Sequence, residues 1–279
     1  MPALDLDHLR QWIGRTETAD DLITPRAVRE MRVILDREPG DPADGEAATL
    51  TAHWCLAPPA VRPAGLGPDG HPARGGFLPP VPLPRRMWAG GLLTFHDPLR
   101  VGDRVRRTSR IADVAVKAGR TGKLCFVTVE HDYATARGSA LTERQDLVYR
   151  SVEAAPGGAG RAEAPRAPAV QESIATSPVL LFRYSAVTFN GHRIHYDRSY
   201  CVAEEGYPGL VVHGPLQATL LCELAGRLLG RAPVRFAFRS VRPVFDGAPM
   251  TLNAVPAGDG FELWTADRDA RPCMLAEAR

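Results

Sequence analysis

The nine residues "FNGHRIHYD", from Phe189 to Asp197, bring an amide, two imidazoles, a guanidinium, a phenol and a carboxylate together in one short stretch. Such a stretch is typical of an active-site loop, although a polar turn can carry the same residue types. His195 is the natural candidate for moving a proton, because an imidazole titrates near neutral pH. Further along, "HGPLQATLLCELAGRLLG" places Gly214 and Pro215 at the start of a predicted helix. The residues therefore suggest chemistry between an imidazole and the free amides of a helix start.

A wider stretch around this loop carries a family resemblance. "FRYSAVTFNGHRIHYDRSY", followed by "YPGLVVHGPLQATLL", resembles the MaoC-like (R-specific) enoyl-thioester hydratase family. The likeness is greatest to a branch with a degenerate N-terminal hot-dog domain, which includes type 2 hydroxyacyl-thioester dehydratases and mesaconyl-C4-CoA or itaconyl-CoA hydratases. "GPDGHPARGGFLPPVPLPRRMWAGG" resembles the same branch, so the likeness covers most of the chain. The resemblance implies a double hot-dog fold and a lyase that needs no cofactor.

Hydration of an α,β-unsaturated thioester requires two kinds of group. A proton-transfer group must act on water near the β-carbon, and hydrogen-bond donors must face the thioester oxygen, where negative charge develops. His195 suits the first role. We expect the N–H of Gly214 to fill the second, because a helix start is electropositive and glycine lets a ligand approach closely.

The loop departs from the family pattern at two positions. In most such hydratases the residue five before the histidine is an aspartate, which here is Asn190, and the residue three before it is an asparagine, which here is His192. An amide cannot accept a proton, although it can orient water or hold the thioester. We therefore place Asn190 in the catalytic set with His195 and Gly214, and a turn residue is the alternative. His192 or Asp197 could compensate for the missing carboxylate.

The remaining candidates are predicted to bind substrate, and they are His192, Arg193, His213, Arg85, Arg86 and Trp88. An arginine could meet a free carboxylate or a CoA phosphate. Structural alternatives are a solvated loop histidine for His192, a surface arginine for Arg193 and a helix-start residue for His213. The histidines and Asp197 fit no strong metal-ligand spacing, and the reaction needs no Lewis acid, so no metal is expected.

The whole chain has 279 residues, which suits two domains of ordinary size. Its net charge of +2 gives no reason to expect nucleic acid as a partner. The five cysteines are scattered and never form CxxC, which argues against disulfides or structural zinc and favours a reducing cytoplasm. The chain opens without an apolar signal and has no run of about 18 apolar residues, so we expect a cytoplasmic protein outside the membrane.

Composition divides the chain into two halves. "EAAPGGAGRAEAPRAPAV", from Glu153 to Val170, contains no aromatic residue, Leu or Ile, and is interpreted as a linker. The predicted units are a degenerate, non-catalytic hot-dog domain over 1–152, a linker over 153–172 and a catalytic hot-dog domain over 173–279. A shared pattern favours an internal duplication, because "HDPLRVGDRV" and "VRPVFDGAPM" each place a proline four residues before a glycine. A homodimer is plausible.

Local patterns predict an α+β protein. Leucines on one stripe predict a helix over 214–229 with Gly230 as its C-terminal cap, and Thr24 caps a second predicted helix over 25–36. Residues 178–189, "PVLLFRYSAVTF", are rich in β-forming residues and predict a strand. Long alternating runs predict further strands in both halves. The Pro- and Gly-rich segment 57–86 is far too long for a simple turn, and its apolar residues favour an ordered lid or a dimer-like contact.

The leading prediction is therefore a hydratase, or in reverse a dehydratase, acting on a thioester of CoA or an acyl-carrier protein. Mesaconyl-C4-CoA or itaconyl-CoA is the preferred substrate class, from the resemblance and the available arginines. The alternatives are a 3-hydroxyacyl-thioester dehydratase of fatty-acid type and a non-catalytic acyl-CoA-binding subunit. A short pocket ending at an arginine would favour the diacid, and a long apolar tunnel would favour the fatty chain.

Overall fold

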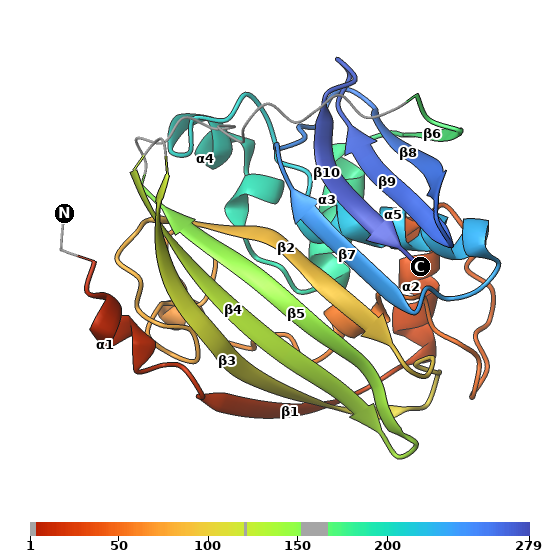
Figure 1. Cartoon of the computed structure of the whole chain (residues 1–279), viewed down its shortest axis with the longest axis horizontal. Helices are drawn as coiled ribbons and strands as arrows, with labels where there is room; N and C mark the ends of the chain where they lie inside the picture. The colour runs from red at the N-terminus through yellow and green to blue at the C-terminus, as the bar shows by residue number, and fades with distance from the viewer. Residues whose placement is uncertain (1–3, 120–121, 152–166) are drawn as a thin grey trace.

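The computed structural model describes residues 4–119, 122–151 and 167–279. Its strands form one ten-stranded antiparallel sheet in the order β1-β3-β4-β5-β2-β7-β10-β9-β8-β6 (Figure 1). The strands of the first half are β1 (Thr16–Leu22), β2 (Arg85–Phe95), β3 (Arg104–Gly119), β4 (Gly122–Thr135) and β5 (Gly138–Arg150). Those of the second half are β6 (Val170–Ile174), β7 (Arg235–Ser240), β8 (Met250–Ala257), β9 (Gly260–Ala266) and β10 (Pro272–Ala278). The α-helices are α1 (Leu6–Arg10), α2 (Pro25–Ile34), α3 (Pro178–Val187), α4 (Arg198–Ala203) and α5 (Gly214–Leu229).

Two similar halves meet at β2 and β7. These strands pair antiparallel, with Gly90 opposite Arg239 and Thr94 opposite Arg235. Outward from this seam the order is β2-β5-β4-β3-β1 on one side and β7-β10-β9-β8-β6 on the other. Each half therefore contributes five strands in the same relative order, and one chain imitates a dimer. This is the α+β double hot-dog arrangement expected from the sequence, and it supports an internal duplication.

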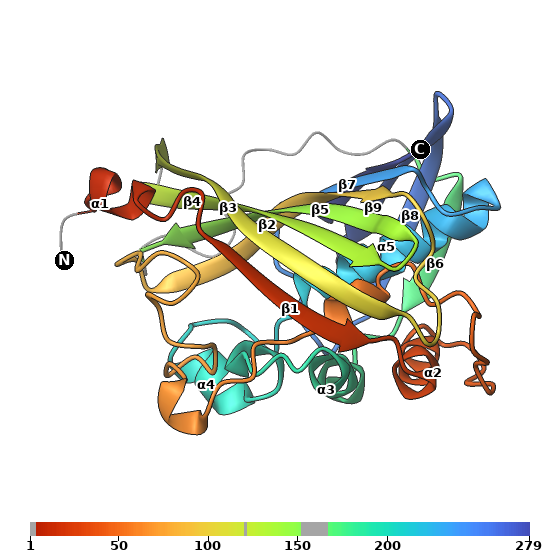
Figure 2. The same ribbon diagram turned by 90° about the horizontal axis from the view of Figure 1, so that it is seen from below.

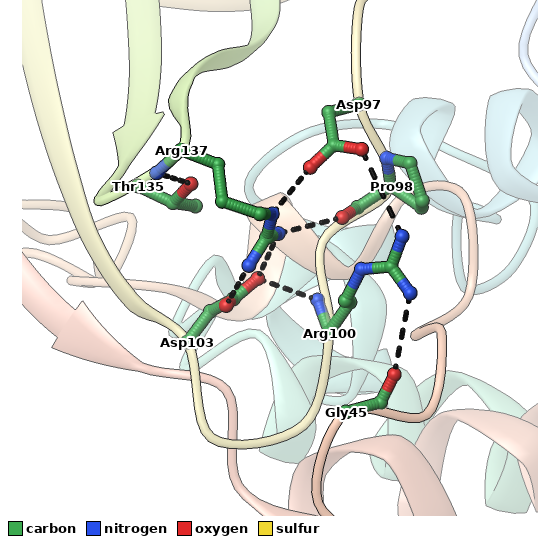
Figure 3. A network of polar contacts seen from close by, with 7 residues as sticks. All are labelled: Gly45, Asp97, Pro98, Arg100, Asp103, Thr135 and Arg137. Atoms are coloured by element: carbon green, nitrogen blue, oxygen red, sulfur yellow. Dashed lines mark hydrogen bonds and ion pairs between the residues drawn. The ribbon is translucent and has the colours of Figure 1, made fainter.

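Equivalent turns follow β2 and β7, where the shared Pro and Gly pattern occurs. Gly102 and Gly247 have φ of +89° and +85°, a conformation that glycine adopts without strain. In the first half the Arg137 guanidinium braces the turn by donating to Asp97 (2.6 Å) and to Asp103 (2.7 and 2.8 Å) (Figure 3). The repeated pattern thus marks the entry into the long strands β3 and β8.

Helices α2, α3, α4 and α5 lie on one face of the sheet (Figure 2). Helix α5 lies at the centre of the main core, and its residues from Leu216 to Ala225 are all buried. It ends at Gly230, whose φ of +67° is the left-handed C-terminal cap that the sequence predicts. Because the helix is apolar on nearly every side, the curled sheet and the neighbouring helices enclose it.

Helices α2 and α3 begin in the same way, shortly after the edge strands β1 and β6. Side-chain oxygens of Thr24 and Ser177 accept hydrogen bonds from the first turn, and Pro25 and Pro178 occupy the first helical position. The two helices pack against each other beneath the sheet. They are therefore equivalent elements of the duplicated halves.

The predicted strand over 178–189 is wrong, since most of it forms α3. Its buried residues Leu181, Tyr184 and Ser185 are spaced three and four apart, as one face of a helix requires. The β-forming composition is outweighed by the Ser-Pro start and by packing of this face on the core.

The first half has no described helix as long as α5. Instead, the Pro- and Gly-rich segment before β2 covers its strands, with Val81 and Leu83 buried in one cluster with Ile111, Val127 and Tyr149. Phe77 and Leu78 pack against the same cluster. This segment is ordered, as its apolar residues predict, and it takes the place of a helix over this part of the sheet.

The connection between the halves is described only in part. Residues 152–166 lie outside the described ranges, so the linker over 153–172 stays a prediction there. Residues 170–172 belong to strand β6, which pairs with β8, so ordered structure begins before that predicted boundary. Among the described residues, no helix is both long enough and apolar enough to cross a bilayer.

Candidate active site

The loop after α3 is shaped by Asn190. The Asn190 N–H donates to the Ser185 carbonyl (2.8 Å), and Asn190 Oδ1 accepts from the N–H of His192 (3.0 Å). These bonds turn the chain into the short 3-10 helix η3 (Arg193–His195). Asn190 thus has the geometry of a turn residue, while its NH2 group has no hydrogen-bond partner among the described residues and can meet a ligand.

His195 is buried and held in one tautomer. Its Nδ1 lies 2.7 Å from the carbonyl oxygen of Val211, and because a carbonyl can only accept, Nδ1 carries the proton. Burial lowers the pKa of His195 to about 4, although the hydrogen bond to Val211 opposes the shift. The neutral ring therefore presents Nε2 as a proton acceptor, as the predicted role requires.

His213 and Gly214 form the start of α5 beside this ring. The His213 ring stacks on His195 with 3.6 Å between centroids, and His213 Nε2 lies 2.8 Å from Ser185 Oγ. His213 is completely buried, so it supports His195 from behind, which agrees with the helix-start alternative. The Gly214 N–H has no hydrogen-bond partner within the described ranges. A Cβ at Gly214 would stand 3.1 Å from the indole of Trp88, so glycine also keeps the space between α5 and β2 open.

A loop of the first half docks directly on residues 189–197, the loop predicted to be catalytic. The Arg193 N–H donates to the carbonyl of Asp69 (2.9 Å), and the Arg193 guanidinium donates to the carbonyl of Pro68 (3.1 Å). Gly70 and Gly191 meet backbone to backbone, since a Cβ on Gly70 would lie only 2.0 Å from the Gly191 carbonyl oxygen. Both glycines are needed for this approach, and it brings residues 68–71 into the site.

The docked loop delivers an Asp–His pair that the sequence analysis does not single out. His71 Nδ1 lies 3.0 Å from Asp69 Oδ2, and the His71 N–H donates to Asp69 Oδ1 (3.1 Å). The His71 ring centroid is 4.1 Å from that of His192, which is 5.3 Å from that of His195. The only signal in the sequence is the spacing Asp69-Gly70-His71. Nothing local shows that this pair meets a loop more than a hundred residues away.

Charge and burial set the protonation of this group. Burial lowers the pKa of His71 despite the opposing hydrogen bond to Asp69, and burial with neighbouring histidines lowers the pKa of His192 to about 2. Burial opposes ionisation of Asp69, but the side-chain and backbone hydrogen bonds from His71, together with the charge interactions with His71 and His192, outweigh it and keep the carboxyl pKa low. Asp69 is therefore ionised and the imidazoles are neutral, so His71 carries its proton on Nδ1 and exposes the lone pair of Nε2.

The three candidate arginines have different surroundings. Arg85 pairs with Glu205 (3.2 Å) and also donates to its carbonyl (2.7 Å), and Arg193 pairs with Asp197 (2.8 Å). Both are occupied by structural contacts. Arg86 has no carboxylate partner among the described residues, lies within electrostatic range of His71 and His192, and bonds the phenol of Tyr149. Arg86 is thus the one of the three candidate arginines that has no carboxylate partner among the described residues.

Aromatic side chains close the space next to Gly214. The Trp88 ring packs on Phe238 with 4.6 Å between centroids and meets Trp54 edge to face at 5.4 Å. The Trp54 indole N–H donates to the buried carboxylate of Glu143 (2.9 Å), which fixes its orientation. Trp54 is not among the predicted residues, although Trp88 is. The two indoles form a rigid wall at the inner end of the site.

Comparison with known proteins identifies the family. The family model of hydroxyacyl-thioester dehydratase type 2 matches residues 51–246. The chain belongs to this family. It is 44% identical over 266 residues to the mesaconyl-C(4)-CoA hydratase of Chloroflexus aurantiacus, covering 95% of both chains.

Solved structures agree on the fold. HtdX of Mycobacterium tuberculosis superposes with a TM-score of 0.68 at 20% identity, over 95% of this chain and 99% of that chain. A further Mycobacterium tuberculosis protein, reported to have a double hotdog fold, superposes with a TM-score of 0.52 at 13% identity, over 95% of both chains. As a type 2 hydroxyacyl-thioester dehydratase, the protein is a lyase that adds or removes water at an acyl thioester. The alternative of a non-catalytic binding subunit is therefore not supported.

The site of this dehydratase does not have the character of a metal centre. Ligand atoms of Asp69, His71 and His192 lie within 4.8 Å of one another. However, an ionised Asp69 can only accept, so the contact with His71 Nδ1 is a hydrogen bond whose proton a metal would have to displace, and the positive charge of Arg86 acts on His71 at the same place. The set considered from the sequence does not converge either, because Asp197 is used by Arg193 and by the cap of α4.

Proposed function

We propose that this dehydratase hydrates a short dicarboxylyl-CoA of the mesaconyl-C4-CoA type. The observation that carries the proposal is Arg86, a cation without a carboxylate partner among the described residues and within electrostatic range of His71 and His192. The Chloroflexus relative, which is named for this substrate, gives independent support. A free carboxylate on the acyl group would neutralise Arg86, and a plain fatty chain would leave a half-buried charge unpaired.

The aromatic wall supports a short acyl group. Trp54, Trp88 and Phe238 pack edge to face and ring on ring, and Trp88 lies beside Gly214 at the start of α5. Close-packed aromatic rings leave little room, and opening a channel through them would cost the burial of two indoles. A fatty-acid type of substrate is therefore the weaker candidate.

The reaction uses the groups already described. The thioester oxygen lies at the N–H of Gly214, where the helix start stabilises the enolate that forms. A water molecule donates a hydrogen to Nε2 of His195, which orients its lone pair toward the β-carbon. The NH2 group of Asn190 can hold the thioester or the water. A neutral imidazole of the site takes the proton that leaves the water and returns it to the α-carbon. No net proton or electron is exchanged.

The test measures the hydration of a panel of enoyl-CoA substrates. Each reaction is monitored by the loss of ultraviolet absorbance of the conjugated thioester. The panel contains mesaconyl-C4-CoA, itaconyl-CoA, crotonyl-CoA and one long-chain enoyl-CoA. The wild type should have its highest kcat/KM with a dicarboxylyl-CoA. Arg86→Gln should lower that kcat/KM by about 10- to 100-fold, the worth of a charged hydrogen bond, and should leave crotonyl-CoA hydration within about threefold.

The control is Arg239→Gln, which removes an exposed arginine from the neighbouring strand β7. It should leave every substrate unchanged. Preference for the long-chain substrate, or an equal loss on all substrates in Arg86→Gln, would contradict the proposal. The cytoplasmic location, the homodimer and the use of CoA rather than a carrier protein stay predictions from the sequence.

A further inference from the structure

Two imidazoles of the site, His195 and His71, have Nδ1 held by an oxygen acceptor and Nε2 free to accept a proton, and they differ in the group that supplies this oxygen. His195 is backed by the neutral carbonyl of Val211 (2.7 Å), whereas His71 is backed by the carboxylate of Asp69 (3.0 Å). An imidazolium is stabilised by an anion on its far nitrogen far more than by a carbonyl dipole. Of the two rings, His71 is therefore better suited to carry a positive charge during the reaction.

The catalytic loop provides no carboxylate for this purpose. Asn190 is an amide, and its Oδ1 already accepts from the N–H of His192. Asp197 accepts from Arg193 and caps α4. The carboxylate in contact with an imidazole of this cluster is Asp69, which comes from the first half.

We infer that Asp69–His71 is a second proton-transfer group of the site, so that the first half takes a direct part in the reaction. This inference rests on the hydration chemistry proposed above. The attacking water donates one hydrogen to Nε2 of His195 and the other to Nε2 of His71. The second proton moves to His71, the water oxygen bonds to the β-carbon, and the π electrons move to the α-carbon and the thioester oxygen. His71 then returns the proton to the α-carbon, so protons and electrons balance without a co-reactant.

The docking of residues 68–71 is what makes this role possible. The hydrogen bond from the Arg193 N–H to the Asp69 carbonyl (2.9 Å) and the contact of Gly70 with Gly191 fix the loop backbone. Asp69 then accepts from the backbone N–H of His71 through Oδ1 and from the ring Nδ1–H through Oδ2, which fixes the position of the ring. The titratable and charged groups around His71 are Asp69, His192, His195, Arg86 and Arg74, and Asp69 is the anion among them.

The experiment measures kcat and KM for His71→Gln and Asp69→Asn with each CoA thioester that the wild type hydrates. We expect kcat to fall by about 10²–10⁴-fold in His71→Gln, the usual contribution of a general acid or base, with KM within about threefold. Asp69→Asn keeps the shape, but its single oxygen can accept from only one of the two His71 N–H groups, so the ring loses its anion and its fixed tautomer. In this variant kcat should fall by about 10- to 100-fold. Its acidic limb of kcat should move to lower pH, because the imidazolium loses its anion. Matched controls are His96→Gln and Asp259→Asn, two exposed positions away from the site.

A rescue experiment separates proton transfer from a merely structural role. Asn190→Asp added to Asp69→Asn should restore kcat by at least about tenfold, because it places a carboxylate near the same water. A kcat within about threefold of wild type in both single variants, a change in KM alone, or no rescue would overturn the inference. Activity that EDTA removes and zinc restores would assign the cluster to a metal and would also overturn it. If the wild type hydrates crotonyl-CoA but no dicarboxylyl-CoA, the substrate proposal fails while the role of His71 is still measured.

Discussion

The two halves share a sheet topology but hold different parts of the site. In the second half, the interval between β6 and β7 contains α3, the catalytic loop and the long helix α5. In the first half, the interval between β1 and β2 contains α2, two short 3-10 helices and the Pro- and Gly-rich segment. The second half has the central helix α5, whose first turn has free N–H groups. The first half has no described helix of this length, and instead its loop 68–71 extends to the second half.

This difference shows how an apparently degenerate half can still contribute to the site. Its strands pair with β7 through β2, and β2 carries both Arg86 and Trp88. Its loop carries Asp69 and His71 to the other half. The sequence predicts a non-catalytic first half. The positions of Asp69 and His71 support a direct part for this half in the reaction inferred above.

The largest effect should come from His195 in the second half. His195→Ala should lower kcat by about 10²–10⁴-fold, because the water loses the imidazole that orients it. The carbonyl of Val211 also loses its donor, so a modest fall in the melting temperature, equivalent to about 1 kcal/mol, is expected. Hydration kinetics and thermal melting measure the two effects. A folded variant with full activity would show that His195 is not essential for hydration. The control is His96→Gln, at an exposed position.

An intermediate loss of stability and of kcat should follow from disrupting the backbone contact between Gly70 of the first half and Gly191 of the second. Gly70→Ala places a Cβ 2.0 Å from the Gly191 carbonyl oxygen, at a φ of +86°. Gly14 has the same φ of +86° but nothing within 4 Å, so Gly14→Ala isolates the cost of the backbone conformation, about 1 kcal/mol.

Gly70→Ala should lose about 1–3 kcal/mol more than this control, measured by denaturant unfolding. Its kcat should fall by about tenfold or more, because the loop with His71 is displaced, while Gly14→Ala should keep its kcat. Equal stability and equal kcat in the two variants would mean that the loop contact does not position the site.

The smallest effect is expected for Asn190→Asp, which restores the residue that most hydratases of the resembling family carry. An aspartate retains an oxygen for the His192 N–H, so the turn should survive. We expect kcat within about tenfold of wild type and an unchanged melting temperature. Complete inactivity in a folded protein would mean that the NH2 group of Asn190 makes an essential contact with the substrate.

Local signals in the sequence are sufficient for much of the second half. Pro215 and Gly230 delimit α5, and the loop residues together with the helix start point to His195 and Gly214. The strand predicted over 178–189 is wrong because β-forming composition is a weaker signal than the Ser177-Pro178 helix start. The same kind of start at Thr24 correctly predicts α2, so the information needed for α3 is present in the sequence.

The sequence by itself determined the duplicated pattern, the central helix, the catalytic loop and the family, because each depends on residues close together in the chain. The tertiary structure alone decided that Asp69 and His71 meet His192, that Arg86 has no described carboxylate partner while Arg85 does, and that Trp54 stands behind Trp88. These relations join residues far apart in sequence. They depend on how two halves pack and on backbone approaches that only glycine permits, and no local spacing encodes them.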